Sequence, residues 1–216
     1  MRLFYLVFIL FFLISCKNEL KREVFDNKNG MTSIIKKKPE VDFNKVKLKS
    51  EEAFQFCKSK GFNTDFCILI DMSLHSGIKR FFIWDFKTKS ISKRYLVGHG
   101  CGSNPWSKDY SKDSPKFSNE DGSHLSALGK YKLQGREYSD WGIHVKYLMH
   151  GLESTNNNAL KRFIVFHSWD MMNDEEIFPN GSPEGWGCPT VSDNAMKEID
   201  PMLQNSTNPV LMWIYN

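Results

Sequence analysis

The sequence has no excess of charge of one sign, few cysteines and no signature of a zinc site. Its 29 basic and 25 acidic residues leave a net charge of +4, which is too balanced to predict a nucleic-acid-binding surface. Neither a paired Cys-x-x-Cys spacing nor a His-Glu-x-x-His motif occurs among its five cysteines and six histidines. Without internal repeats, and with 41% hydrophobic residues, the chain is expected to form one ordinary folded domain.

The one long apolar segment lies at the N-terminus. Arg2 precedes an unbroken apolar run over residues 3–14, which is shorter than the about 20 residues that a membrane-spanning helix needs. The run closes in a Leu-Ile-Ser-Cys ending at Cys16, which resembles the lipobox of bacterial lipoproteins. We therefore expect residues 1–15 to be a lipoprotein signal peptide and Cys16 to carry lipid. The mature protein would then sit in the cell envelope, anchored to a membrane and facing the periplasm or cell wall.

The segment after Cys16 has the composition of a tether. Residues 16–49 contain only two aromatic side chains, Phe25 and Phe43, and more basic than acidic residues. Such a stretch cannot bury enough apolar surface to form a core. We expect it to be flexible and to connect the lipidated N-terminus to a catalytic domain over residues 50–216.

Most of the domain has the pattern of β-strands. Short β-branched or aromatic segments are separated by Gly, Asp and Ser; they are residues 66–70, 80–84, 92–97, 130–133, 142–147, 163–166 and 210–215. One helix is expected to begin at Ser50, which two glutamates follow, and to stop at Gly61. Another is expected after a cap at Ser192 and to restart or kink at Pro201. The prediction is a mainly β fold with a few short helices.

The cysteines after Cys16 have different surroundings. Cys57 and Cys67 could form a disulfide in an exported protein or remain as buried free thiols, and the sequence leaves both open. Cys101 lies in a glycine-rich loop. Cys188 lies between glycine and proline, on what we expect to be a rigid, uncrowded loop, and is the best candidate for a reactive thiol.

A histidine lies upstream of this thiol. His167 ends an apolar strand, so its imidazole is expected at the rim of a sheet, and Cys188 follows 21 positions later. An imidazole nearby can lower the pKa of a thiol from about 8.5, and the resulting thiolate attacks carbonyl carbons. The pair is the minimum for acyl transfer, although a structural histidine has the same pattern.

A longer series of motifs is more specific. In order along the chain they are residues 68–71, 80–85, 97–100, 117–119, 122–123, 126–129, 151–153, 156–159, 162–167 and 187–189. The series resembles the murein L,D-transpeptidase catalytic domain family of the YkuD-like L,D-transpeptidase superfamily, and it covers nearly all of residues 66–216. The resemblance implies a β-sandwich-type catalytic domain.

The resemblance also implies roles for individual residues. Cys188 would be the nucleophile, His167 its general base, and the backbone N–H groups of Trp186, Gly187 and Cys188 the oxyanion hole. The candidate substrate cleft would include His99, Ser118, Asn119, Arg162, Ser168 and Trp186. For the first four of these residues the sequence leaves a purely structural role equally open. The reaction would join a peptidoglycan stem peptide to Cys188 as a thioester and pass it to an amine, or to water in an L,D-carboxypeptidase, with no metal or organic cofactor.

Two positions depart from the family pattern. Ser168 follows the histidine where the family commonly has glycine, and Glu184-Gly185 stands where the family has Arg-Ser. These departures bear on substrate preference. The group that orients His167 stays open; the candidates are a backbone carbonyl, Ser168, Asp170, Asp174, Glu175 and Glu176.

Two other functions are also compatible with the sequence. A catalytically inactive wall-binding lipoprotein is one alternative. A zinc-dependent peptidase is the other, with ligands drawn from His75, His99, His124, His144, His150, His167 and Cys188. The six tryptophans and 17 phenylalanines are assigned mostly to the core. Trp186, beside the cysteine, is the exception that could line an acyl pocket.

Overall fold

The computed structural model describes residues 36–216. The predicted signal peptide over residues 1–15, the lipidation of Cys16 and the first part of the predicted tether lie outside the described residues. None of the helices within residues 36–216 is long and apolar enough to cross a membrane.

The first helix, α1 (Phe43–Lys60), begins earlier than the sequence predicts. The carboxylate of Asp42 accepts hydrogen bonds from the N–H groups of Asn44 and Lys45, at 2.9 and 3.1 Å, and thereby satisfies donors of the first turn. Ser50 therefore lies within α1, and the predicted start there is wrong because Asp42 already supplies the cap. The predicted end is confirmed, since Gly61 caps the helix with a left-handed φ of 71°.

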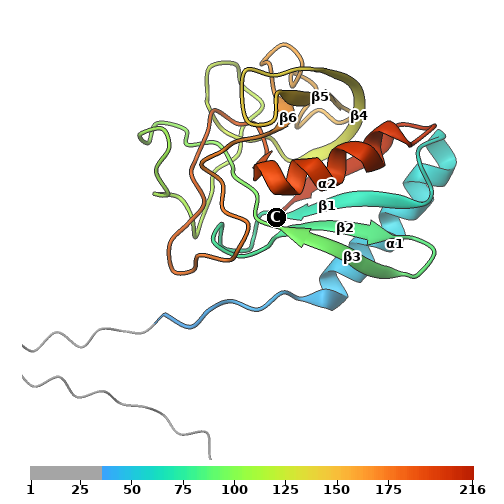
Figure 1. Cartoon of the computed structure of the whole chain (residues 1–216), viewed down its shortest axis with the longest axis horizontal. Helices are drawn as coiled ribbons and strands as arrows, with labels where there is room; N and C mark the ends of the chain where they lie inside the picture. The colour runs from blue at the N-terminus through green and yellow to red at the C-terminus, as the bar shows by residue number, and fades with distance from the viewer. Residues whose placement is uncertain (1–35) are drawn as a thin grey trace, which may run out of the picture. The chain divides into compact units, whose positions relative to one another are not determined.

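Eight strands form one hydrogen-bonded sheet in the order β3-β2-β1-β8-β4-β5-β6-β7. Figure 1 shows β1, β2 and β3 side by side, and β4, β5 and β6 grouped in another part of the view. They are β1 (Phe66–Asp71), β2 (Phe81–Asp85), β3 (Ser90–Tyr95), β4 (Gly129–Tyr138), β5 (Val145–Gly151), β6 (Val165–Ser168), β7 (Thr190–Val191) and β8 (Val210–Tyr215). The pairs β1–β8 and β6–β7 are parallel, and the others are antiparallel. The predicted mainly β fold is confirmed.

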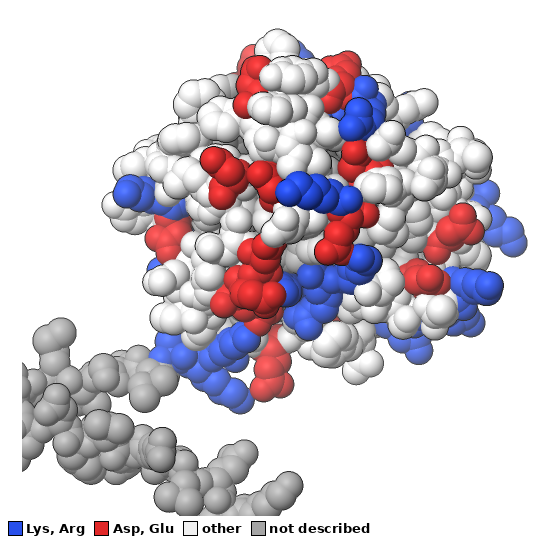
Figure 2. Space-filling model, viewed as in Figure 1, with Lys and Arg blue, Asp and Glu red and all other residues white. Residues whose placement is uncertain are grey.

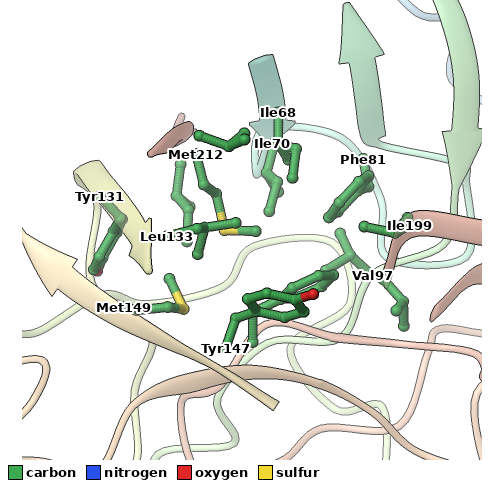
Figure 3. Close-up of a cluster of buried hydrophobic side chains, with 14 of the residues drawn as sticks. Ile68, Ile70, Phe81, Val97, Tyr131, Leu133, Tyr147, Met149, Ile199 and Met212 are labelled. Atoms are coloured by element: carbon green, nitrogen blue, oxygen red, sulfur yellow. The ribbon is translucent and has the colours of Figure 1, made fainter. Parts of the chain in front are cut away.

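Alternate side chains of the central strands point to opposite faces of the sheet and enter two cores. On one face, Ile68 and Ile70 of β1 pack in the same cluster as residues of β4, β5 and the second helix, α2 (Asp193–Gln204). Figure 3 shows members of this cluster, including Tyr131, Leu133, Tyr147, Met149, Ile199 and Met212. Because β1 and β5 share one core, the sheet must bend so that its two halves face each other.

The opposite face of β1 is covered by α1. Cys67 and Leu69 are buried there against Val46, Ala53 and Cys57 of the helix. Cys57 and Cys67 are both free thiols, so the alternative of buried thiols holds and the disulfide does not. Burial raises the pKa of Cys57 to about 12, which makes it chemically inert at neutral pH.

Helix α2 packs on the core between the two halves of the sheet. Ser192 caps it, as predicted, by accepting a hydrogen bond from the N–H of Ala195 at 3.1 Å. The helix continues through Pro201 to Gln204. On the face in Figure 2, acidic and basic side chains are interleaved. Among the ion pairs of the domain is that of Lys79 with Glu175, at 3.1 Å.

Candidate active site

The parallel pairing of β6 and β7 brings His167 and Cys188 together. His167 lies within β6, opposite Thr190 of β7, and Cys188 is two residues before Thr190. The chain between the two strands therefore returns the cysteine to the strand that carries the histidine. Both residues line one cavity of about 330 Å³.

The sulfur of Cys188 is held by the backbone at the start of β6. The N–H of Val165 donates to Sγ at 3.4 Å, and the thiol donates to the carbonyl of Phe163 at 3.7 Å. Burial raises the pKa of Cys188, and the Val165 N–H and the charge of Arg162 only partly oppose it. The expected lowering of the pKa is therefore wrong for the free protein, because desolvation outweighs the nearby donors.

The ring of His167 is oriented by the backbone. Its Nδ1 lies 2.9 Å from the carbonyl oxygen of Ser168. A carbonyl only accepts, so Nδ1 carries the proton and Nε2 keeps its lone pair. Of the orienting groups that the sequence left open, the structure therefore selects a backbone carbonyl. Burial lowers the pKa of His167 below its ordinary value, so the imidazole is neutral at pH 7 and its Nε2 lone pair can accept a proton.

A protonated thiol beside a neutral imidazole predicts a specific pH dependence. Alkylation of Cys188 by iodoacetamide, which needs the thiolate, is expected to be slower at pH 7 than that of a free cysteine. Because burial raises the pKa of Cys188 above that of an ordinary thiol, the rate should keep climbing beyond the pH at which that of a free cysteine levels off. Samples quenched at successive times and analysed by intact-mass spectrometry give this rate.

The Cys188→Ala variant identifies the labelled residue, since Cys57, Cys67 and Cys101 are also free thiols. An alkylation rate that levels off below pH 7 would contradict the expectation. It would mean that a thiolate–imidazolium pair already exists in the free protein.

The loop before Cys188 presents unpaired backbone donors. Within residues 36–216, the N–H groups of Trp186, Gly187 and Cys188 donate no hydrogen bond, whereas buried N–H groups are nearly always paired. Gly187 has a φ of 107°, and a Cβ there would lie 2.7 Å from the carbonyl oxygen of Leu125. Only glycine fits this position, so the path of the backbone before Cys188 depends on Gly187.

This loop is tied to two other loops. The N–H of Gly185 donates to the carbonyl of His99 at 2.8 Å, and the N–H of Cys101 donates to the carbonyl of Gly185 at 2.8 Å. The hydroxyl of Ser126 donates to the carbonyl of Gly187 at 3.0 Å. The segment that carries the N–H groups is thus fixed from both sides before any substrate binds.

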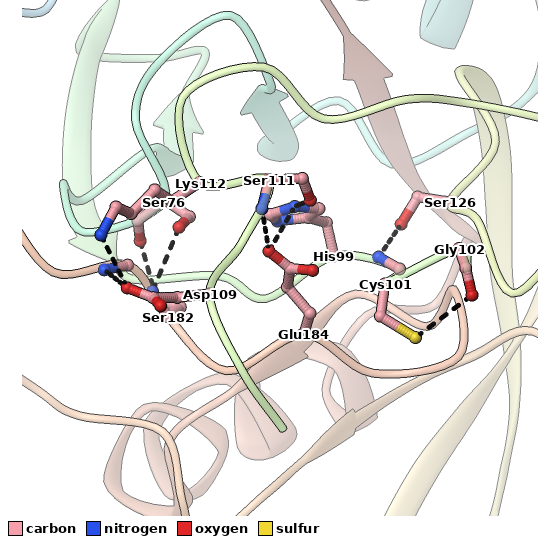
Figure 4. A network of polar contacts seen from close by, with 12 residues as sticks. Ser76, His99, Cys101, Gly102, Asp109, Ser111, Lys112, Ser126, Ser182 and Glu184 are labelled. Atoms are coloured by element: carbon pink, nitrogen blue, oxygen red, sulfur yellow. Dashed lines mark hydrogen bonds and ion pairs between the residues drawn. The ribbon is translucent and has the colours of Figure 1, made fainter. Parts of the chain in front are cut away.

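His99 lies behind this loop rather than in the cavity. Its ring is fully buried; Nδ1 accepts from Arg80 at 2.8 Å and Nε2 donates to Ser111 at 2.9 Å. Glu184 is also fully buried, 3.8 Å from His99 Nε2, and accepts from the N–H of Ser111 at 2.6 Å (Figure 4). The assignment of His99 to the cleft is wrong, because Arg80 and Glu184 draw it into a buried polar network.

Three other cleft candidates also lie outside the cavity lining. Ser168 is buried and its hydroxyl accepts from the N–H of Ile143 at 3.0 Å. Ser118 and Asn119 hold neighbouring loops; the amide of Asn119 donates to the carbonyl of Ser154 at 2.9 Å. These three assignments are corrected to structural roles, because each side chain is used in a turn or loop contact.

Arg162 and Trp186 do line the cavity. The guanidinium of Arg162 donates to the carbonyls of Ser118 and Leu125, at 2.7 and 2.6 Å, and so remains beside the site. Trp186 is 63% exposed and stacks on His124, with 5.2 Å between the two ring centroids.

Sequence reasoning missed several residues of the cavity wall. They are Trp106, Asp121, His124, Trp141, Phe163, Trp169 and Thr190. Phe163 is 85% exposed and has a φ of 55°. The only sequence signal for Trp106 and Trp141 is their position among turn-forming Asn, Pro, Ser, Asp and Gly residues rather than in a strand.

The histidines proposed as alternative zinc ligands are dispersed. Within residues 36–216, no three His, Cys, Asp or Glu side chains gather in an arrangement that could hold a metal ion. The zinc-peptidase alternative therefore has no ligand set in the described part of the chain.

The mainly β domain thus places a cysteine and a histidine in one cavity, beside backbone N–H groups that donate no hydrogen bond. This arrangement is typical of enzymes that use a cysteine nucleophile and a histidine base. The family model described as L,D-transpeptidase catalytic domain matches residues 37–215. The chain belongs to this family. The matched residues include the whole of α1, whereas the domain boundary predicted at residue 50 falls within that helix.

Solved structures with a similar fold have low sequence identity. The helical cell shape determining protein Pgp2 from Campylobacter jejuni has a TM-score of 0.43 and 11% identity, over 70% of this chain and 47% of that one. The Ldtfm–avibactam carbamoyl enzyme has a TM-score of 0.40 and 12% identity, over 70% and 49%. An L,D-transpeptidase from Xylanimonas cellulosilytica has a TM-score of 0.36 and 11% identity, over 74% and 68%. This chain spans about half the length of the first two. No curated protein matches it.

Proposed function

We propose that the protein is a peptidoglycan L,D-transpeptidase with Cys188 as its nucleophile. The observation that carries the proposal is one cavity that combines the Cys188 thiol, a neutral His167 with a free Nε2 and the unpaired N–H groups at residues 186–188. Membership of an L,D-transpeptidase family supports peptidoglycan stem peptides as the proposed substrate class.

The first half-reaction follows from these groups. Nε2 of His167 takes the proton of the Cys188 thiol, and Sγ attacks the carbonyl carbon at the L-centre of the diamino acid in the donor stem. The carbonyl oxygen becomes an oxyanion that residues 186–188 stabilise by about 2.7–4 kcal/mol for each donor. The imidazolium then returns the proton to the departing amine, so that terminal D-alanine leaves and a thioester remains.

The second half-reaction decides the product. An amine from a neighbouring stem attacks the thioester, His167 accepts its proton, and a new amide cross-link forms as the thiol is restored. Water in the same position gives an L,D-carboxypeptidase product. Thiol, imidazole and amide groups supply every step, so the proposal includes no metal or organic cofactor.

The proposed setting is the cell envelope. Lipid on Cys16 would hold the protein on a membrane outside the cytoplasm, and the segment before α1 would connect it to the domain. The domain would then act on peptidoglycan within reach of that membrane.

The test of the function is a two-part assay with a free stem tetrapeptide. We expect D-alanine to be released, and the intact mass of the protein to increase by the acyl group that remains as a thioester. Adding an acceptor stem should convert that species to a cross-linked product, which chromatography and mass spectrometry identify. Folded protein that neither releases D-alanine nor gains mass, yet sediments with sacculi, would favour the wall-binding alternative.

A further inference from the structure

Three indole rings gather on the wall of the cavity that holds Cys188. Trp106 lies 5.1 Å from Trp169 and 6.1 Å from Trp141 between ring centroids, and Trp141 lies 6.2 Å from Trp169. All three line the cavity. Trp169 is buried, whereas Trp106 and Trp141 remain 42% and 46% exposed. We call these three residues the indole platform; its exposed apolar surface is of the kind that marks a binding site.

The backbone around Trp141 fixes this ring beside β6. The N–H of Trp141 donates to the hydroxyl of Ser139 at 3.1 Å, and the N–H of Ile143 donates to the hydroxyl of Ser168 at 3.0 Å. A Cβ on the intervening Gly142 would lie 2.0 Å from that same hydroxyl. The loop is therefore packed directly against the residue that follows His167.

The other two rings are attached to the same framework. The residue after Trp106, Ser107, donates its N–H to the carbonyl of Glu184 at 2.9 Å, at the start of the loop that leads to Cys188. Trp169 donates its own N–H to the carbonyl of Val191 in β7 at 2.9 Å. The indole platform is thus held in a fixed position relative to both His167 and Cys188.

The chemistry of the indole platform suits a sugar ring. A pyranose has one face of C–H groups, which pack on the electron-rich face of an indole, and a rim of hydroxyl groups. The indole N–H groups of Trp106 and Trp141 are donors of the kind that can bond to the hydroxyl groups of that rim. The charged groups of Arg162 and Asp121 also line the cavity, outside the indole platform, and could serve the charged groups of a stem peptide.

We infer that the indole platform binds an amino-sugar ring of the glycan strand to which the donor stem is attached. The inference rests on the proposed function, because peptidoglycan stems are linked to amino sugars. It specifies the substrate class further: the preferred donor is a stem still joined to its glycan, and the cavity holds peptide and sugar together.

The test uses a peptide-free probe, a tetramer of N-acetylglucosamine. Titration into the protein should quench tryptophan fluorescence and give a binding isotherm by calorimetry. Trp141→Leu should weaken binding by about ten-fold or more, the scale of one lost aromatic stacking contact, and Trp106→Leu should do the same. The matched control is Tyr110→Leu, since Tyr110 is an exposed aromatic residue, 66% exposed, in the same loop as Trp106 but does not line the cavity.

The outcomes separate this inference from the proposed function. Absence of binding to the unaltered protein, or equal weakening by Tyr110→Leu, overturns the sugar site. If D-alanine is released from the free tetrapeptide but the tetramer does not bind, the proposed function stands and the inference falls. If the tetramer binds in a platform-dependent way but no thioester forms, the sugar site stands and the proposed function falls.

Discussion

Replacing Cys188 with alanine is expected to abolish the acyl-enzyme and to reduce D-alanine release by about 10⁴-fold or more. The thiol is the only group in the proposed reaction that forms a bond to the substrate, so the remaining imidazole and N–H groups can bind but cannot form the thioester. Intact mass after incubation with a tetrapeptide or a carbapenem, together with the D-alanine assay, measures both effects.

The matched control is Cys101→Ala. Cys101 is another free thiol, buried near the same loop, and its hydrogen bond is to the carbonyl of Gly102 rather than to the cavity. This variant should retain the adduct and the D-alanine release of the unaltered protein. An adduct that persists in Cys188→Ala, or one that disappears in Cys101→Ala, would place the nucleophile elsewhere.

The strands were predictable because their signal is local. Alternation in β1 and β8 sends successive side chains into two cores, and seven of the eight strands overlap a segment that the sequence indicates. The two residues of β7 are too few to show any alternation. The start of α1 was missed because a polar, aromatic-poor composition indicated a tether, whereas a single capping carboxylate at Asp42 was enough to begin the helix.

The centre of the site was predictable only in part. The motif series indicated His167 and Cys188, and the structure places both in one cavity. The resemblance implied a cleft position for His99 as an alternative to a structural role, and its two flanking glycines do not distinguish the two. In the structure, those glycines permit close contacts, since a Cβ on Gly98 or Gly100 would lie 2.3 or 2.2 Å from neighbouring atoms. Which tryptophans remain uncovered depends on how distant loops meet, and no local pattern encodes that.

The polar network behind the site contains a fully buried guanidinium group, that of Arg80. It donates to the carbonyls of Leu74 and Val97, at 2.9 and 3.1 Å, and to Nδ1 of His99. Burial lowers the pKa of Arg80 to about 9, and the charges of Asp71 and Glu184 oppose that shift. The guanidinium is therefore still charged at pH 7. It links β2 to the loop of His99, which in turn holds Gly185.

Arg80→Met is consequently expected to lower the free energy of unfolding by about 3–5 kcal/mol. The substitution keeps most of the side-chain volume but leaves the carbonyls of Leu74 and Val97 without donors and the buried Glu184 carboxylate without its counter-charge. For a domain of this size the midpoint of thermal unfolding should fall on the order of 10 °C. Denaturant unfolding followed by circular dichroism measures the free-energy change.

Arg94→Met is the matched control, because Arg94 lies in β3 opposite Phe82 of β2, the strand that Arg80 precedes, but is partly exposed. Its ion pair with Glu176, at 3.7 Å, is of the surface kind that contributes about 1 kcal/mol or less. A similar loss of stability in both variants would show that side-chain packing, and not the buried charge, determines the effect. A loss confined to Arg80→Met, accompanied by slower acylation of Cys188, would show that the buried network also holds the nucleophile loop in place.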